Sequence, residues 1–134
     1  MPIEALETGL YNKLKADSSL TTLLGGTLIY NRRAPQNPGT AYVVFQWQGG
    51  GDENLQPSRS RNVLYTVKAV CDTAEKAAAV DSAIDTALHN TTLTVSGWTN
   101  INVVRTDDVN FVESTGVETA YYHAGGIYQI QIDA

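Results

Sequence analysis

Cysteine is almost absent from this sequence, since Cys71 is the only one among 134 residues. A single cysteine cannot form an internal disulfide, which excludes the small cross-linked domains typical of secreted proteins. Long apolar runs are also missing, because no segment approaches the roughly 20 apolar residues that a helix needs to cross a bilayer. The first residues carry no basic segment followed by an apolar one, so we expect no signal peptide, synthesis in a reducing cytoplasm and no membrane partner.

Basic side chains are scarce as well. The sequence has nine Lys and Arg against fourteen Asp and Glu, for a formal net charge of −5. The imbalance is uneven: residues 1–71 hold seven basic and five acidic side chains, whereas residues 72–134 hold two basic and nine acidic ones. Phosphate contacts require clustered Lys and Arg, so this balance argues against specific binding of nucleic acid.

The sequence does contain the apolar content of an ordinary globular domain. Hydrophobic residues make up 43% of the chain and charged residues 17%, without repeats or low-complexity tracts. A chain of this length can bury roughly two-thirds of its unfolded surface. We therefore expect one domain over residues 1–134.

Apolar residues at three- and four-residue steps predict two amphipathic helices, over residues 3–16 and 73–89. Asp72 is the expected N-cap of the second, because Glu75 follows it at the spacing of a capping box. A shorter helical turn is expected after Asp17 and should end at Gly25. The buried faces of the two long helices comprise Ile3, Leu6, Leu10 and Leu14, and Ala77, Val80, Ala83, Ile84, Ala87 and Leu88.

Alternating polar and apolar residues predict the strands. Short connections favour antiparallel pairing, and the helix over residues 73–89 is long enough for a crossover. The sequence therefore predicts an α+β fold: a mixed, mainly antiparallel β-sheet with both amphipathic helices packed on one face. The expected strands span residues 28–31, 41–48, 61–71, 101–106 and 121–132, with a weak one over 93–95.

The face of the sheet away from the helices is expected to be rich in amides. Side chains of this kind suit either water or a protein neighbour, and both interpretations stay open. The amides concerned are Gln46, Gln48, Gln129 and Gln131.

Catalytic patterns are not recognisable in the sequence. His89 ends a predicted helix, where a histidine suits the helix dipole, and His123 has no cysteine or carboxylate at ligand spacing. Cys71 closes a strand on its buried face. Adjacent carboxylates such as Asp107 and Asp108 are expected in a solvated loop rather than poised as acid and base. We therefore predict no enzyme, no metal and no cofactor.

The segment 49–60 is expected to be mobile, either as a loop or as the tip of a hairpin. It begins with Gly49, Gly50 and Gly51, continues through polar residues, and has only Leu55 as an apolar anchor. The three glycines match neither dinucleotide-binding nor phosphate-loop spacing. The segment should become ordered by contact with a neighbouring protein.

Several segments together resemble the opening of the phage tail-completion proteins. The layout agrees further along, through the strand ending near Cys71 and the alanine-rich helix after it. Relatives tend to place proline directly before the aromatic of the second strand, where this chain has Ala41. The opening segments are Leu20–Gly26, Leu28–Tyr30, Arg33–Gln36 and Tyr42–Gln46.

This resemblance implies a structural virion protein made in the bacterial host cytoplasm. It implies a homo-oligomeric ring, commonly a hexamer, that caps the tail tube protein, ends tail polymerisation and joins the head–tail connector protein in the tail–neck region. DNA would pass through the ring channel without specific binding. The alternatives are another head–tail adaptor, a minor tail protein, or a non-viral small α+β binding module.

The uneven charge suggests how such a ring could close. Rings form through contacts in which one patch meets a different patch on the next copy, so arginines of one subunit could pair with acids of the next. Scattered, solvated charges are the alternative interpretation. The candidate interface residues, for subunits or tube, are Arg32, Arg33, Gly49, Gly50, Gly51, Asp52, Glu53, Arg59, Arg61, Asp107, Asp108, Glu113 and Glu118.

Overall fold

The computed structural model describes residues 3–35, 40–52, 60–114 and 120–133. The order of helices and strands is the predicted one. In chain order the elements are α1 (Ile3–Lys15), α2 (Ser18–Leu24), β1 (Ile29–Asn31), β2 (Ala41–Asp52), β3 (Ser60–Cys71), α3 (Ala74–Leu88), β4 (Thr99–Ser114) and β5 (Ala120–Asp133). No helix in these ranges is long and apolar enough to cross a membrane.

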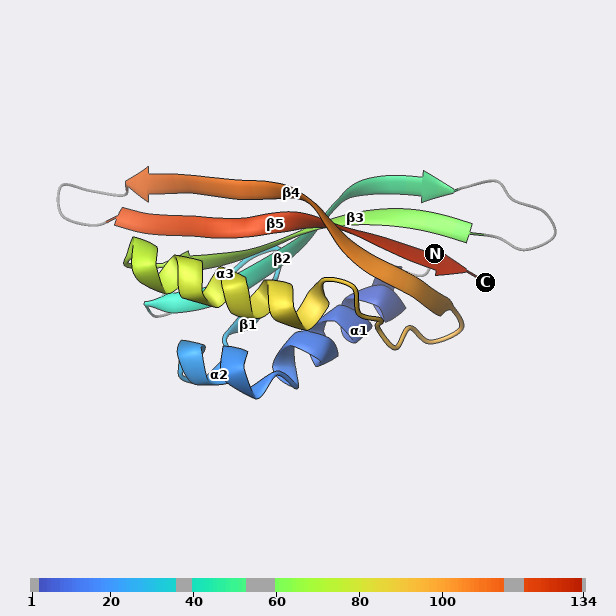
Figure 1. Cartoon of the computed structure of the whole chain (residues 1–134), viewed down its shortest axis with the longest axis horizontal. Helices are drawn as coiled ribbons and strands as arrows, with labels where there is room; N and C mark the ends of the chain where they lie inside the picture. The colour runs from blue at the N-terminus through green and yellow to red at the C-terminus, as the bar shows by residue number, and fades with distance from the viewer. Residues whose placement is uncertain (1–2, 36–39, 53–59, 115–119, 134) are drawn as a thin grey trace.

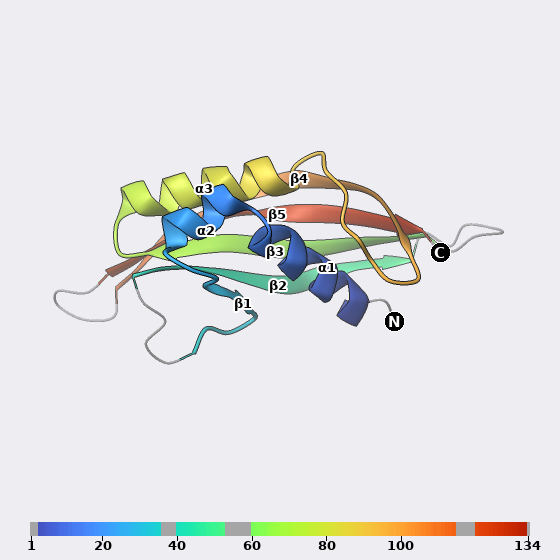
Figure 2. The same cartoon turned by 90° about the horizontal axis from the view of Figure 1, so that it is seen from below.

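The strands form one sheet in the order β1-β2-β3-β5-β4. The pairs β2–β3, β3–β5 and β5–β4 are antiparallel, and β1 pairs with β2 in parallel. All three helices lie on the same face of this sheet (Figures 1 and 2). The predicted α+β fold, with a mixed and mainly antiparallel sheet and helices on one face, is confirmed.

The parallel pairing of β1 departs from the expectation that a short connection joins antiparallel strands. Ile29 lies opposite Val43, and Asn31 lies opposite Phe45. Arg32 then adopts a left-handed φ of 67°, and its N–H donates to the Phe45 carbonyl at 2.7 Å. This turn takes the chain off the sheet edge, so the connection can return and enter β2 in the same direction.

Strand β2 extends four residues beyond the prediction, so residues 49–52 are not a loop. Its pairing with β3 shifts register between Trp47 and Gly49 and continues to Asp52 opposite Arg61. At Gly50, where φ is 109°, a Cβ atom would collide with the Asn62 carbonyl oxygen. Gly50 therefore permits a close strand pair here. The remainder of that predicted loop, residues 53–59, lies outside the described residues.

Strand β4 is also longer than predicted, reaching Ser114 where the prediction ended at residue 106. Register shifts after Asn100 and Arg105 keep it paired with β5 along its length. Asp107 and Asp108 are therefore strand residues, and the prediction that they lie in a loop is wrong. The weak strand predicted over residues 93–95 is absent from the named strands, because that region makes only an isolated bridge between Val95 and Trp98.

Helix caps explain where α2 and α3 begin. Asp17 accepts the Leu20 N–H at 2.9 Å, as predicted for α2, and Gly25 ends that helix with φ 78°. For α3 the N-cap is Thr73, whose hydroxyl accepts the Lys76 N–H at 3.2 Å. The predicted cap, Asp72, lies one residue too early and forms an ion pair with the Lys76 ammonium at 3.1 Å.

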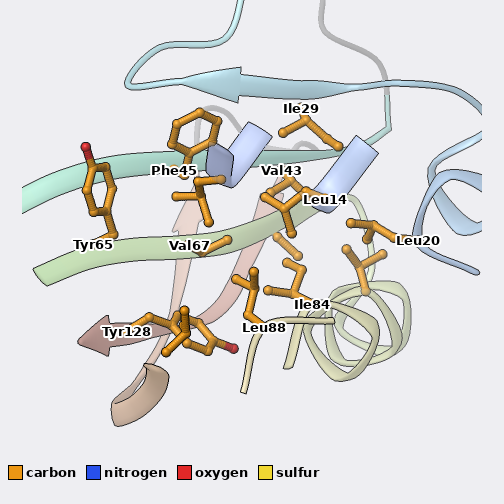
Figure 3. Close-up of a cluster of buried hydrophobic side chains, with 14 of the residues drawn as sticks. Leu14, Leu20, Ile29, Val43, Phe45, Tyr65, Val67, Ile84, Leu88 and Tyr128 are labelled. Atoms are coloured by element: carbon orange, nitrogen blue, oxygen red, sulfur yellow. The ribbon is translucent and has the colours of Figure 1, made fainter. Parts of the chain in front are cut away.

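The core lies between the helices and the sheet (Figure 3). Leu6, Leu10 and Leu14 of α1 are fully buried, as predicted, and Ile84 and Leu88 of α3 pack on the same cluster. The strands supply alternate side chains, namely Val43, Phe45, Val63, Tyr65, Val67, Ala69, Cys71, Tyr128, Ile130 and Ile132. The predicted periodicity of both helices and strands is therefore confirmed.

Gly125 in β5 marks a place where strands approach too closely for a side chain. A Cβ atom there would collide with the Val67 carbonyl oxygen and the Lys68 Cα of β3. Gly125→Ala is expected to lower the free energy of unfolding by about 1–3 kcal/mol, since the backbone of a central strand must move. The matched control is Gly49→Ala, whose Cβ meets nothing within 4 Å. Chemical denaturation of both variants measures the difference, and equal midpoints would contradict it.

Candidate assembly surface

Arg105 of β4 organises the acidic residues around it. Its guanidinium meets both carboxylate oxygens of Asp81 from α3, at 2.8 and 3.2 Å, and its Nε donates to Asp108 at 2.9 Å. A further donation reaches the Gly125 carbonyl at 2.7 Å. The Asp81 carboxylate is the main reason why the pKa of Arg105 is raised. One side chain, 16% exposed, thus joins α3, β4 and β5.

Tyr128 lies beneath this ion pair. The Arg105 Cζ is 5.8 Å from the Tyr128 ring centroid, and the Tyr128 hydroxyl donates to Asp85 at 3.1 Å. Burial is the main cause that raises the pKa of Tyr128. Because the phenol stays protonated, it can donate to Asp85 while the guanidinium packs over its ring.

The acidic candidates on β4 differ in their contacts. Asp107 is exposed, whereas Asp108 bonds to Arg105 of its own chain although its side chain is 84% exposed. Glu113 lies 3.2 Å from Nε2 of His123, which donates to it when that nitrogen carries the proton. The predicted acids therefore lie along one strand, and two of the three already have partners within the subunit. Glu118 lies outside the described residues.

His123 is buried, not a surface residue. Its ring stacks on Phe111 with centroids 4.2 Å apart, and the Lys68 ammonium lies 5.0 Å from the Phe111 ring centroid. Burial lowers the pKa of His123, while the hydrogen bond to Glu113 opposes that shift. This cluster occupies the sheet face opposite the helices, near the end of β4.

The basic candidates are less available than the sequence suggested. Arg32 forms an ion pair with Glu7 of α1 at 3.2 Å, and Arg33 is exposed just after it. Arg61 is only 7% exposed within β3, so it is not part of the subunit's exposed surface. Arg59, like Glu53, lies outside the described residues. Among the described residues, no ion pair joins Arg32 or Arg33 to the acids of β4 within one subunit.

The glycine candidates lie at the opposite end of the sheet from the acids of β4. Gly49, Gly50, Gly51 and Asp52 form the last part of β2, paired with β3. The Trp47 indole N–H donates to the Gly49 carbonyl at 2.8 Å and fixes the bulge that precedes them. The described candidates thus fall mainly on the ends of two strands.

His89 and Cys71, which were considered above for catalysis or metal binding, have clear positions in the fold. His89 is the C-cap of α3, and its Nδ1 accepts the Arg105 N–H at 3.1 Å, so it acts there as an acceptor rather than as a cation on the helix dipole. Cys71 is fully buried, and burial raises the pKa of its thiol to about 11. Across the described ranges, no group of three or more His, Cys, Asp and Glu could hold a metal ion.

Sequence reasoning missed two features of this surface. Phe111 and Val112 are 44% and 57% exposed on neighbouring positions of β4, so apolar side chains emerge on both faces of that strand. The sequence signal for their exposure was their position between acidic residues, because apolar side chains in an acidic segment are not expected to reach the core. The role of Arg105 in joining α3, β4 and β5 gave no sequence signal, since Asp81 and Gly125 lie 20 or more residues away and only Asp108 is close in the sequence.

The fold and its candidate residues define a class: an α+β protein whose notable surface features are strand ends and ion pairs. Comparison with known proteins gives the particular family. The sequence profile of the tail completion protein gp17 family matches residues 8–124. Because this match covers most of the chain, the chain belongs to the tail completion protein gp17 family, and it is a structural protein of phage tails.

Solved structures agree in fold. The chain is similar to a chain of the virion of a native gene transfer agent particle, with a TM-score of 0.82 and 17% identity over 98% of this chain and 97% of that one. It is also similar to a second solved structure, with a TM-score of 0.59 and 12% identity over 98% of this chain and 94% of that one. No curated protein sequence matches it significantly.

Proposed function

We propose that this protein forms a ring that caps the phage tail tube, ends tail polymerisation and provides the joint to the head connector. Membership of the tail completion family carries this proposal. The similarity in fold to a chain of a phage-like virion particle supports it. The ring would be built from identical copies, as a hexamer if it follows the resemblance noted from the sequence.

Termination of the tube depends on the surface at its growing end. The growing end of a tube presents the surface that each new ring binds, so growth stops when a different protein covers that surface. A ring can dock by one face and offer another surface on the opposite face, because the contacts that close it join two different patches. A net charge of −5 disfavours retention of DNA phosphates in the channel.

The test is electron microscopy of particles produced without this gene. We expect overlong tubes and heads without tails, because nothing covers the growing end. Re-expression of the intact gene should restore tails of normal length. Normal-length tails joined to filled heads would contradict the proposal, and normal-length tails that lack heads would instead indicate a head–tail adaptor.

A further inference from the structure

The two outer edges of the sheet are each covered along one half only. On β2, the partner strand β1 pairs with Val43, Val44 and Phe45. On β4, residues that follow α3 cover the edge: Thr91 bridges Val103, and the Asn90 N–H donates to the Val103 carbonyl at 2.7 Å. Among the described residues, no strand pairs with the outer edge of β2 over residues 46–52 or of β4 over residues 106–114.

These two open stretches lie at opposite ends of the sheet. Residues 46–52 pair with residues 61–66 of β3. Residues 106–114 pair with residues 120–127 of β5, which in turn pair with residues 66–71 of β3. Figure 1 shows the β2–β3 pair extending at one end of the molecule and the β4–β5 pair at the other. An open strand edge presents backbone N–H and C=O groups that can pair with another chain.

The polarity of the strands suits a contact between two copies. Three successive antiparallel pairings separate β2 from β4, so the two strands run in opposite directions. A second copy in the same orientation therefore presents its β2 edge antiparallel to the β4 edge of the first. This contact joins two different patches, as a closed ring requires.

Charge disfavours the simplest competing contact, in which two β4 edges pair with each other. An antiparallel pairing of residues 106–114 with themselves would place Asp107 opposite Glu113, twice, and like charges directly opposite are destabilising. The β2 stretch instead offers Gln46, Gln48 and glycines, and its only charged residue is Asp52 at its end. A glycine edge also accepts a bulky neighbour, and Phe111 on β4 is 44% exposed.

We propose that residues 106–114 of β4 in one copy pair antiparallel with residues 46–52 of β2 in the next, so that the sheet continues around the ring. The inference rests on the proposed ring and names the contact that closes it. Because the open stretches lie at opposite ends, each neighbour is displaced along the strands. In a closed ring this displacement requires strands tilted to the ring axis, as in a barrel.

Disulfide trapping in purified tails tests the contact. Aligning the two stretches centre to centre places Gln46 opposite Glu113, and both side chains are exposed. Oxidised tails that carry Gln46→Cys with Glu113→Cys should lose most of the monomer band to a ladder ending at the closed ring. Gln46→Cys with Phe111→Cys covers a register shifted by two residues. The native thiol of Cys71 stays out of the reaction because it is fully buried.

Single and mismatched variants serve as controls. Each single variant should stay monomeric on the gel, while coexpressed Gln46→Cys and Glu113→Cys chains should give dimers only. Gln46→Cys with Ser82→Cys, on the exposed side of α3, should give no ladder. Asn110, which is exposed, would lie opposite itself if two β4 edges paired, so a dimer from Asn110→Cys alone would overturn the inference in favour of paired β4 edges.

An amine-reactive cross-linker separates this contact from the ring itself. If it gives a ladder while both designed pairs fail to cross-link, the ring stands and the edge pairing is wrong. If it gives no oligomer either, the proposed ring fails and the edge pairing with it.

Discussion

Replacing Ile84 by aspartate is expected to remove a large part of the free energy of unfolding and to lower the melting temperature sharply. Ile84 is fully buried in α3, inside the cluster that joins the helices to the sheet. The variant removes a large apolar side chain and places a carboxylate within the apolar core cluster, at a combined cost of about 4 kcal/mol or more. Domains of this size are stable by only about 5–15 kcal/mol. Circular dichroism during thermal unfolding measures the loss.

The control for this variant lies two residues away on the same helix. Ser82 is exposed, so Ser82→Asp adds the same charge to α3 and should change the free energy of unfolding by less than about 0.5 kcal/mol. Burial raises the pKa of an unpaired carboxyl, so the folded state of Ile84→Asp binds a proton more tightly than the unfolded state. Its stability should therefore recover as the pH falls below 7. Equal melting temperatures for the two variants would show that α3 does not cover the core.

The periodicity of the sequence predicted the core because burial repeats with the geometry of each element. Leu10 and Leu14 fall on one side of a helix, and Val63, Tyr65 and Val67 on one side of a strand. These rules depend on local spacing alone. They fail where pairing decides the structure: Gly49 and Gly50 resemble a loop by composition, yet contact with β3 makes them a strand.

The candidate surface was predictable only in part. The glycines and the acids of β4 that were predicted from the sequence fall in the second halves of β2 and β4, but residues 49–52 and 107–108, which were expected in loops, are strand residues. The coverage of one half of each edge could not be inferred, because it depends on β1 and on Thr91 reaching positions fixed by the whole fold. Ion pairs such as that of Arg105 with Asp81 join residues distant in sequence, and spacing carries no information about them.

The ion pairs of Arg105 lower the negative charge that is available for contacts with other molecules. Asp81 and Asp108 both bond to this guanidinium, and Asp85 lies 3.8 Å from it. A part of the negative charge in the second half of the chain is therefore neutralised within the subunit. It follows that fewer acids than the sequence suggests remain for contacts with another copy, and those contacts depend more on the shape of the strand edges.

Replacing Arg105 by methionine should have the second large effect on stability. The substitution keeps much of the aliphatic stem but leaves Asp81, whose side chain is 21% exposed, near Asp85 without its cation. Breaking a buried ion pair by removing one partner costs about 3–5 kcal/mol, and the partial exposure here lowers our expectation to about 2–3 kcal/mol. Urea denaturation at neutral pH measures the difference.

A double-mutant cycle separates the ion pair from the packing of the stem. In Arg105→Met with Asp81→Asn, both charges of the ion pair are gone, and Asp85 no longer has the Asp81 carboxylate beside it on α3. The double variant should therefore be more stable than Arg105→Met alone. Arg105→Lys should lose an intermediate amount, because an ammonium cannot meet both oxygens of Asp81 while donating to Asp108 and Gly125. Additive losses in the cycle would show that the ion pair between Arg105 and Asp81 does not stabilise the protein. Arg105 immediately precedes the open stretch of β4 and holds it against α3. Variants of Arg105 that fold should therefore also give weaker disulfide trapping between Gln46→Cys and Glu113→Cys.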